Sequence, residues 1–174
     1  RTITVPASLP IRSVKELIDY AKRNPGKLSF GSSGIGSAFH LDGEILKEAA
    51  GIDIVHVPYK GTGPALTDLL AGQVQLIFAD VMVVAQHVKT GRMRGIAVAA
   101  EKRSDTLPEL PTMAEAGLPG HTAESWFGVM VPGRTPDAVI DRLNTEIVRI
   151  LRQPDVRARM ANDGGEPVGN TRRE

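Results

Sequence analysis

The chain has 174 residues, of which 41% are hydrophobic and 24% are charged, and its formal net charge at pH 7 is +1. This is the composition of an ordinary globular domain, and it offers no clustered basic face for nucleic acid. The absence of cysteine excludes disulfides, Cys–zinc sites and cysteine nucleophiles. The longest apolar runs are shorter than the ~18–20 residues of a membrane span. No signal peptide is seen, so if the protein is secreted, we expect this sequence to be its mature form or a fragment of it.

Short apolar runs alternate with amphipathic runs over the first hundred residues. The expected strands are 2–5, 28–30, 54–57, 74–78 and 93–99. The capping box of Ser13 and Glu16 opens the first expected helix, which stops at Asn24. The further expected helices are 37–50, 63–71 and 81–89. This alternation indicates βαβ units, and therefore an α/β fold with a mostly parallel sheet flanked by helices.

The pattern changes after residue 100. Residues 107–120 are rich in Pro and Gly, with a short helix expected around 112–116. Residues 124–131 contain the only tryptophan of the chain and are predicted to form an extended strand. Helices are expected over 136–151 and 155–161, followed by a tail of Gly, Pro and charged residues.

The loop at 31–37, with the sequence GSSGIGS, lies between an expected strand and an expected helix. Such a turn presents backbone N–H groups and the positive end of the helix dipole. Because the loop contains no Asp, Glu, Lys or Arg, it would bind an anion with neutral dipoles alone.

Two further polar loops follow expected strands, at 58–63 (PYKGTG) and 79–80. In an open parallel sheet, ligands bind outside the carboxyl ends of the strands, so we expect the three loops to meet at one edge. There they would present serine hydroxyls from the first loop, Tyr59 and Thr62 from the second, and Asp80 from the third. Glycine and serine can also simply make tight turns, so the convergence carries more weight than any single loop.

The loop at 31–37 does not fit nucleotide-binding motifs. No Gly-Lys-Ser/Thr closes it, and the third glycine of a dinucleotide fingerprint would fall at Phe39. A hydrolase would use Ser33, but the Gly-x-Ser-x-Gly elbow is broken there. No His-x-x-x-His pair or similar spacing indicates a metal site, and no residue is predicted to be catalytic.

The four histidines are expected to be structural or surface residues. His40, one turn beyond Ser37, is expected to cap or pack, and His56 to turn toward a covering helix. His87 and His121 are expected at the surface.

Three long segments together resemble one known family. They are GSSGIGSAFHLDGEILKEAAGIDIVHVPYKGTGPALTDLLAGQVQLIF, KTGRMRGIAVAAEKRSDTLPELPTMAEAGLPG and SWFGVMVPGRTPDAVIDRLN. The chain is similar along nearly all its length to the Bug receptors, the TctC-like extracytoplasmic solute-binding proteins of tripartite tricarboxylate transporters. The resemblance implies a periplasmic, Venus-flytrap-like receptor of the type II periplasmic-binding-protein fold. Its partners would be a small carboxylate solute and membrane transporter subunits, with no cofactor.

The resemblance also implies a division of the chain. Residues 1–131 would be the second, ligand-binding domain, with 2–5 and 126–131 as the two strands that cross between domains. Residues 132–174 would be a helical segment that packs on the first domain. That first domain and the last helix of the family, normally after Val168, are expected to be missing, so half of the cleft would be absent, in a fragment or in a truncated relative.

The ligand loops of the family match the three polar loops. The candidate ligand-binding residues are Ser32, Ser33, Gly34, Gly36, Ser37, Tyr59, Gly61, Thr62 and Asp80. Our hypothesis is that the N–H groups of Gly34, Gly36 and Ser37, helped by the neighbouring hydroxyls, hold one carboxylate.

Two alternatives stay open at this point: an α/β hydrolase-like enzyme using Ser33, and an interaction module without a ligand. We also expect a homodimer through two apolar stretches that would otherwise be exposed, one from Trp126 to Val131 and the other from Val139 to Leu151.

Overall fold

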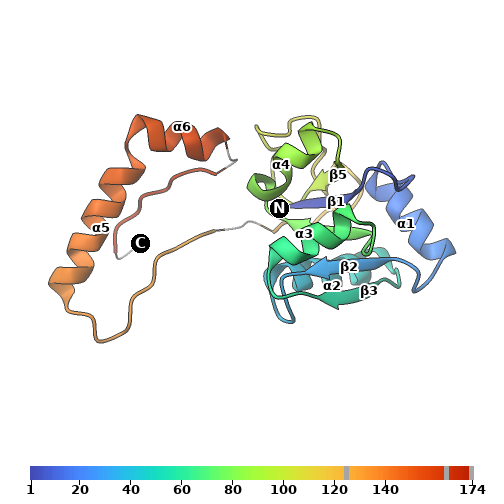
Figure 1. Ribbon diagram of the computed structural model, residues 1–174, viewed down its shortest axis with the longest axis horizontal. Helices are drawn as coiled ribbons and strands as arrows, with labels where there is room; N and C mark the ends of the chain where they lie inside the picture. Colours follow the sequence, from blue (N-terminus) through green and yellow to red (C-terminus); the bar gives the residue numbers. More distant parts are fainter. Residues whose placement is uncertain (124–125, 163–164, 173–174) are drawn as a thin grey trace. The chain divides into compact units, whose positions relative to one another are not determined.

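The chain folds into two units, Arg1–Ser125 and Trp126–Glu174, and each is considered by itself. The computed structural model describes residues 1–123, 126–162 and 165–172 (Figure 1). The first unit contains a five-stranded sheet with helices on both faces. The α/β class expected from the sequence is therefore confirmed.

The strands of this sheet are short. They are β1 (Thr2–Pro6), β2 (Ser29–Ser32), β3 (Val55–Pro58), β4 (Leu76–Ala79) and β5 (Met93–Val98). Their order across the sheet is β3-β2-β4-β1-β5. β2 pairs in parallel with both β3 and β4, whereas β1 runs antiparallel to β4 and β5. The sheet is thus mixed, and β1 is an internal strand that is buried along its whole length.

Helices cover the two faces of the sheet in pairs. The helices of this unit are α1 (Val14–Arg23), α2 (Ala38–Ala50), α3 (Thr62–Leu70) and α4 (Val81–Lys89). α1 and α2 pack into one core with Phe30 and Phe78, and α3 and α4 pack into a second core with Ile77. Because both faces are covered, the internal strand β4 is apolar and buried along its whole length, whereas the edge strand β3 is partly exposed.

The helix ends follow the capping signals of the sequence. Ser13 accepts the Glu16 N–H at 3.1 Å, and the Glu16 carboxylate accepts the N–H of Arg12, the residue before the N-cap, at 2.7 Å, a close variant of the capping box. Ser37 caps α2 by accepting the His40 N–H at 3.3 Å. α2 ends at Gly51, whose φ of +59° is the left-handed conformation that glycine adopts freely.

Two expected elements differ in the structure. Residues 112–116 form a turn and not a helix, because Gly117, with φ +93°, and the Pro119 that follows prevent continuation. Residues 126–131 form no strand, because in the described part of the chain no neighbouring strand pairs with them. Residues 124 and 125 of that expected strand lie outside the described residues.

The second unit consists of α5 (Asp137–Leu151), α6 (Pro154–Asn162) and a following extended segment. The extended segment is held to α5, because Asn144 Nδ2 donates to the Asn170 carbonyl at 3.1 Å and Arg172 pairs with Asp137. No residue of α5 is buried. Both helices agree with the sequence-based prediction to within one residue at each end.

The expectation that His121 lies at the surface is wrong. Its exposed fraction is 3%, and its ring stacks on Phe78 with 6.1 Å between centroids. Neither ring nitrogen has a hydrogen-bond partner among the described residues. Burial disfavours the charged imidazolium and so lowers the pKa of His121. The sequence concealed this because His121 follows a Pro- and Gly-rich stretch that is typical of exposed loops.

Gly43 gives a direct test of the packing between α2 and the sheet. A Cβ atom at this position would lie 2.1 Å from the Phe30 ring. We predict that Gly43→Ala lowers the free energy of unfolding by about 1–3 kcal/mol despite the better helix propensity of alanine. Gly63→Ala in α3 is the matched control, because a Cβ there meets nothing within 4 Å. Equal stability of both variants in urea unfolding would contradict this packing.

His121 should make stability depend on pH. Its folded-state pKa lies below the ordinary value, so the unfolded chain takes up the proton more readily. The contribution of His121 to stability is therefore fully present above about pH 6.5 and is lost as the pH drops toward the pKa of His121 in the folded state. We predict that His121→Leu reduces this loss between pH 7.5 and 5.5 in urea unfolding, whereas His87→Leu does not. The remaining loss would come from His56, whose pKa is lowered by burial and then by the nearby His40.

Candidate functional site

The three polar loops leave the sheet at the same edge. Ser32, the last residue of β2, pairs in parallel register with Pro58, the last residue of β3, and Gly31 pairs with Ile77 of β4. The Tyr59 N–H donates to the Ser32 carbonyl at 3.0 Å, so the first two loops are directly joined. The convergence expected from the sequence is therefore present in the fold.

The start of β1 reaches the same edge. Because β1 is antiparallel to its neighbours, Thr2 pairs with Ala79 at the end of β4 and with Val98 at the end of β5. Arg1 therefore stands beside the loops.

The first loop is held in shape by its own hydrogen bonds. The Gly34 N–H donates to Ser32 Oγ, the Gly36 N–H to His40 Nδ1 and the Ser37 N–H to the Gly34 carbonyl, each at 3.1 Å. Gly34 and Gly36 have φ values of +134° and +76°, where an L side chain would be strained. The three N–H groups assigned to a carboxylate in our hypothesis are thus already used inside the loop.

Other donors remain available at this loop. The N–H groups of Ala38 and Phe39 lie in the first turn of α2, where a helix provides no internal partner. Neither of them has a hydrogen-bond partner in the described ranges of the chain. Ser33 is half-buried beside them, whereas the Ser32 side chain is buried. An anion approaching this edge therefore meets the first turn of α2 and the Ser33 hydroxyl.

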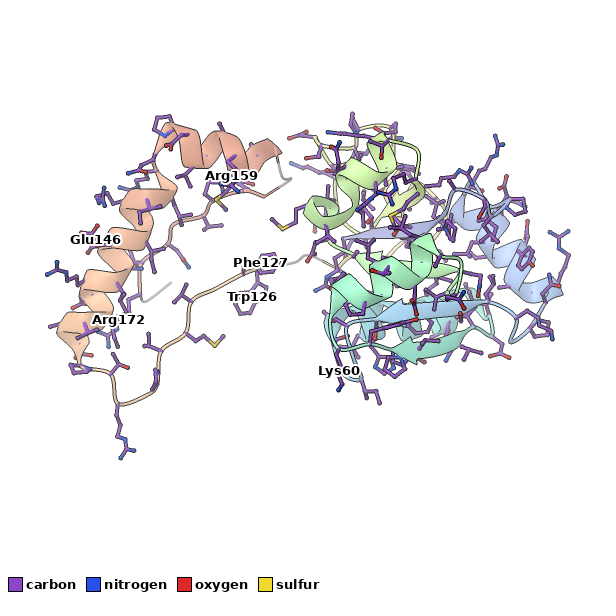
Figure 2. The ribbon with its side chains drawn as sticks, viewed as in Figure 1. Lys60, Trp126, Phe127, Glu146, Arg159 and Arg172 are labelled. Carbon is purple, nitrogen blue, oxygen red and sulfur yellow. The ribbon has the colours of Figure 1, made fainter. Side chains whose placement is uncertain are left out.

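The second loop presents the N-terminus of α3. Gly61 occupies the N-cap position with φ +116° and provides no side-chain cap, so the first N–H groups of α3, including that of Thr62, face outward from the helix. The Tyr59 hydroxyl donates to Asp68 Oδ2 at 2.7 Å. Burial and this carboxylate raise the pKa of Tyr59 to about 12. Tyr59 therefore fixes the loop to α3, and Lys60 lies exposed beside it (Figure 2).

The third loop carries the negative charge of the edge. Asp80 occupies the N-cap position of α4, and its backbone carbonyl accepts the Val83 N–H at 2.9 Å. Its carboxylate is half-buried, next to the start of β1.

A buried ion pair at this edge was not predicted from the sequence. Arg1 Nη1 donates to both oxygens of Asp42 at 3.0 and 3.2 Å, and the Asp42 side chain is only 2% exposed. Burial raises the pKa of Asp42, while the Arg1 guanidinium opposes this rise. The sequence places Asp42 on the buried face of α2, four residues before Leu46. It does not indicate that Arg1, at the start of the chain, is the partner of Asp42.

His40 and His56 form a pair beside the first loop. His40 is half-buried and its Nδ1 accepts the Gly36 N–H, which confirms its structural role. His56 turns toward α2, and the two imidazoles stack with 4.0 Å between centroids. The sequence did not reveal that His56 Nε2 lies 2.6 Å from Ser32 Oγ.

This contact does not provide an exposed nucleophile. Ser32 is 1% exposed, so its hydroxyl is not open to an acyl substrate. Ser33, the residue that an enzyme was expected to use, makes no contact with a histidine in the part of the chain that the structure describes.

Two other kinds of site are absent from the residues that the structure describes. No three His, Cys, Asp or Glu side chains are grouped closely enough to hold a metal ion. No helix there is long and apolar enough to cross a membrane.

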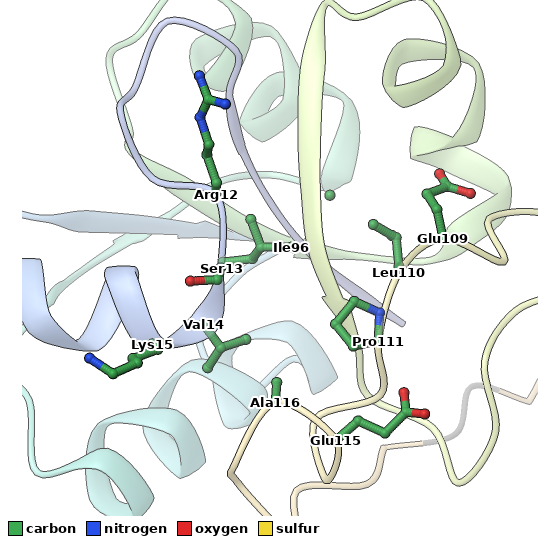
Figure 3. Close-up of a pocket in the computed structure, with 11 residues that line it drawn as sticks. Arg12, Ser13, Val14, Lys15, Ile96, Glu109, Leu110, Pro111, Glu115 and Ala116 are labelled. Carbon is green, nitrogen blue, oxygen red and sulfur yellow. The ribbon is translucent and has the colours of Figure 1, made fainter.

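A separate hollow of about 300 Å³ lies between the start of α1 and residues 109–116 (Figure 3). Arg12, Lys15, Glu109 and Glu115 bring charges of both signs to it. Since α1 follows the end of the antiparallel strand β1, the start of α1 lies at the edge opposite to the three polar loops. The hollow is therefore not part of the loop site.

Comparison with known proteins places the chain in one family. The family described as tripartite tricarboxylate transporter family receptor, TctC, matches residues 1–174. A protein of R. palustris solved with adipate is 38% identical, with a TM-score of 0.93, and the match covers 98% of this chain and 57% of that one. The periplasmic binding protein BugD is 39% identical, with a TM-score of 0.93 and coverage of 97% and 56%.

A third solved structure, MatC from Rhodopseudomonas palustris with bound malate, is 30% identical, with a TM-score of 0.91 and coverage of 95% and 56%. The chain spans about half the length of the curated relatives it matches. The family match over the whole chain and the agreement of the fold lead to one conclusion: this chain belongs to the TctC family of tripartite tricarboxylate transporter receptors, which includes the Bug proteins.

Proposed function

We propose that the chain forms the second, ligand-binding domain of an extracytoplasmic receptor that captures a small carboxylate for a tripartite transporter. The observation that carries this proposal is the meeting of three polar loops at one sheet edge. Two of these loops contain helix N-termini and no acidic residue. The solved relatives that hold adipate and malate support a dicarboxylate as the class of solute.

The edge would hold one carboxylate of the solute. The donors are the first-turn N–H groups of α2 and α3, with the hydroxyls of Ser33, Ser37 and Thr62. Ser32, Gly34, Gly36, Tyr59 and Gly61 would give the loops their shape. Hydrogen bonds to a charged group contribute about 1.5–3 kcal/mol each, and millimolar binding requires roughly −4 kcal/mol. Two or three such bonds are therefore sufficient for weak capture.

Asp80 would act on the rest of the solute. Its carboxylate repels a second anionic group placed close to it and favours a hydroxyl, an ammonium group or an ordered water. It thereby orients a dicarboxylate so that its far end points away from the third loop.

We propose that residues 1–131, with 2–5 and 126–131 as the two segments that cross between domains, contribute one wall of the cleft, and that 132–174 pack against a first domain. Because the chain spans about half the length of its relatives, the second wall would come from that domain. We place the receptor in the periplasm with transporter subunits as its partners, and we propose that it has no enzymatic activity. The buried position of Ser32 supports this, because no serine–histidine pair at this edge is open to substrate.

The binding proposal predicts weak affinity for the chain alone. In calorimetry with malate, adipate, citrate and glutamate, we expect the best solute to bind with a Kd on the order of 1 mM, since only one wall contributes. Ser33→Ala should weaken this binding severalfold, whereas Ser13→Ala at the other edge should leave it unchanged. Micromolar binding by the chain alone would contradict the one-wall account, and binding of none of the four solutes would contradict the proposed ligand class.

We further propose that copies of the chain pair through their second units. Trp126, Phe127 and Met130 are at least 75% exposed, and α5 presents Val139, Leu143 and Ile150 to solvent. Figure 2 shows the two aromatic rings on the segment that precedes α5. Such a concentration of exposed apolar side chains is typical of an interaction surface.

Light scattering at high concentration should therefore report a homodimer. We expect Trp126→Asp combined with Leu143→Asp to give a monomer, and Val168→Asp, which changes an exposed apolar residue outside these stretches, to leave the dimer intact. A wild-type chain that stays monomeric would show that these side chains do not pair two copies.

A further inference from the structure

Two short hydrogen-bonded connections join the glycine amides of the first loop to half-buried imidazoles. In the first connection, the Gly34 N–H donates to Ser32 Oγ at 3.1 Å, and Ser32 Oγ lies 2.6 Å from His56 Nε2. Since the hydroxyl has a single proton, it donates to His56 when that nitrogen is unprotonated. Each partner is then satisfied, and His56 Nε2 is the final acceptor.

The second connection is a single hydrogen bond. The Gly36 N–H donates directly to His40 Nδ1 at 3.1 Å. A backbone N–H can only donate, so His40 Nδ1 must be unprotonated, and the proton of a neutral ring lies on Nε2. That nitrogen faces Glu44 Oε1 at 3.8 Å, which favours the same tautomer.

The two imidazoles act together because they are stacked, with 4.0 Å between centroids and 21° between planes. His56 also packs against the Phe30 ring at 4.9 Å. The charged groups that face the pair are Glu44 and Lys47, both on α2. Burial, and then the neighbouring His40, lower the pKa of His56, which keeps it a neutral acceptor.

We propose that His40 is a positioning residue of the first loop. It holds this loop in its binding shape through Gly36, and the stacked His56 holds Gly34 through Ser32. This inference deepens the proposed function and rests on it only for its binding arm. The pair leaves Ala38, Phe39 and Ser33 free to meet the solute. A loop that is shaped in advance loses less conformational freedom when a solute binds.

The two histidines differ in how they respond to a proton. If His56 Nε2 is protonated, Ser32 Oγ can accept from it and turn its own proton to the Gly34 carbonyl, which lies 3.1 Å away. If His40 Nδ1 is protonated, two donors face each other and the bond to Gly36 is lost. Protonation of His40 therefore releases the loop, whereas protonation of His56 only rearranges it.

The experiment is amide NMR of the whole chain without solute. His40→Ala removes the acceptor, His40→Asn places an amide oxygen near the position of Nδ1 and does not titrate, and His87→Ala is a control for loss of a histidine elsewhere. We expect faster hydrogen exchange and an altered resonance at Gly36 in His40→Ala, and near-wild-type behaviour in the other two variants.

A merely structural role for His40 would give a different pattern. A Gly36 amide that is unchanged in His40→Ala, or equally changed in His87→Ala, would overturn the inference.

The binding arm separates this inference from the proposed function. In NMR titrations with malate and adipate at pH 8, we expect His40→Ala to weaken binding about fivefold and His40→Asn to retain it. Equal affinity of His40→Ala and the wild type would overturn the positioning role. If neither solute binds to any variant while Gly36 still depends on residue 40, the proposed function fails, and the role of His40 in shaping the loop is supported.

Discussion

The parallel register of β2 with β3 and β4 is the constraint on which the site depends. Ser32 pairs with Pro58, and Gly31 pairs with Ile77, so the strands end together and their loops emerge side by side. The bond from the Tyr59 N–H to the Ser32 carbonyl joins the first two loops. A slip of one residue would turn Phe30 out of its core and separate the loops. The packing of this sheet and the shape of the binding edge are therefore set by the same contacts.

Much of the fold could be predicted from the sequence, because its signals are local. The capping box at Ser13, the terminal glycines and the apolar period indicated the five strands and the helices of the first unit, most of them within one or two residues. The meeting of the loops also followed, since strands that alternate with helices run parallel. The turn at 112–116 was missed, because Gly117 and Pro119 overrode a helical pattern.

The parts that could not be predicted depend on contacts between distant residues. β1 takes an internal place in the sheet and runs against its neighbours, which brings Arg1 to Asp42 across 41 positions of sequence. Ser32 and His56 meet only because β2 and β3 are neighbours. These contacts change the account of the first loop: its glycine amides shape the loop, and the amides of the first turn of α2 are left for the solute.

The most direct test of this account is to map a bound solute onto the backbone amides of the chain by NMR. Adding malate or adipate should move the resonances of residues 33–40 and 59–65 most strongly, because they form the edge where the loops meet. Resonances of residues 12–15 and 109–116, around the hollow of Figure 3, should stay in place. The largest changes at that hollow, with the loop amides unmoved, would contradict the claim that the converging loops bind the carboxylate.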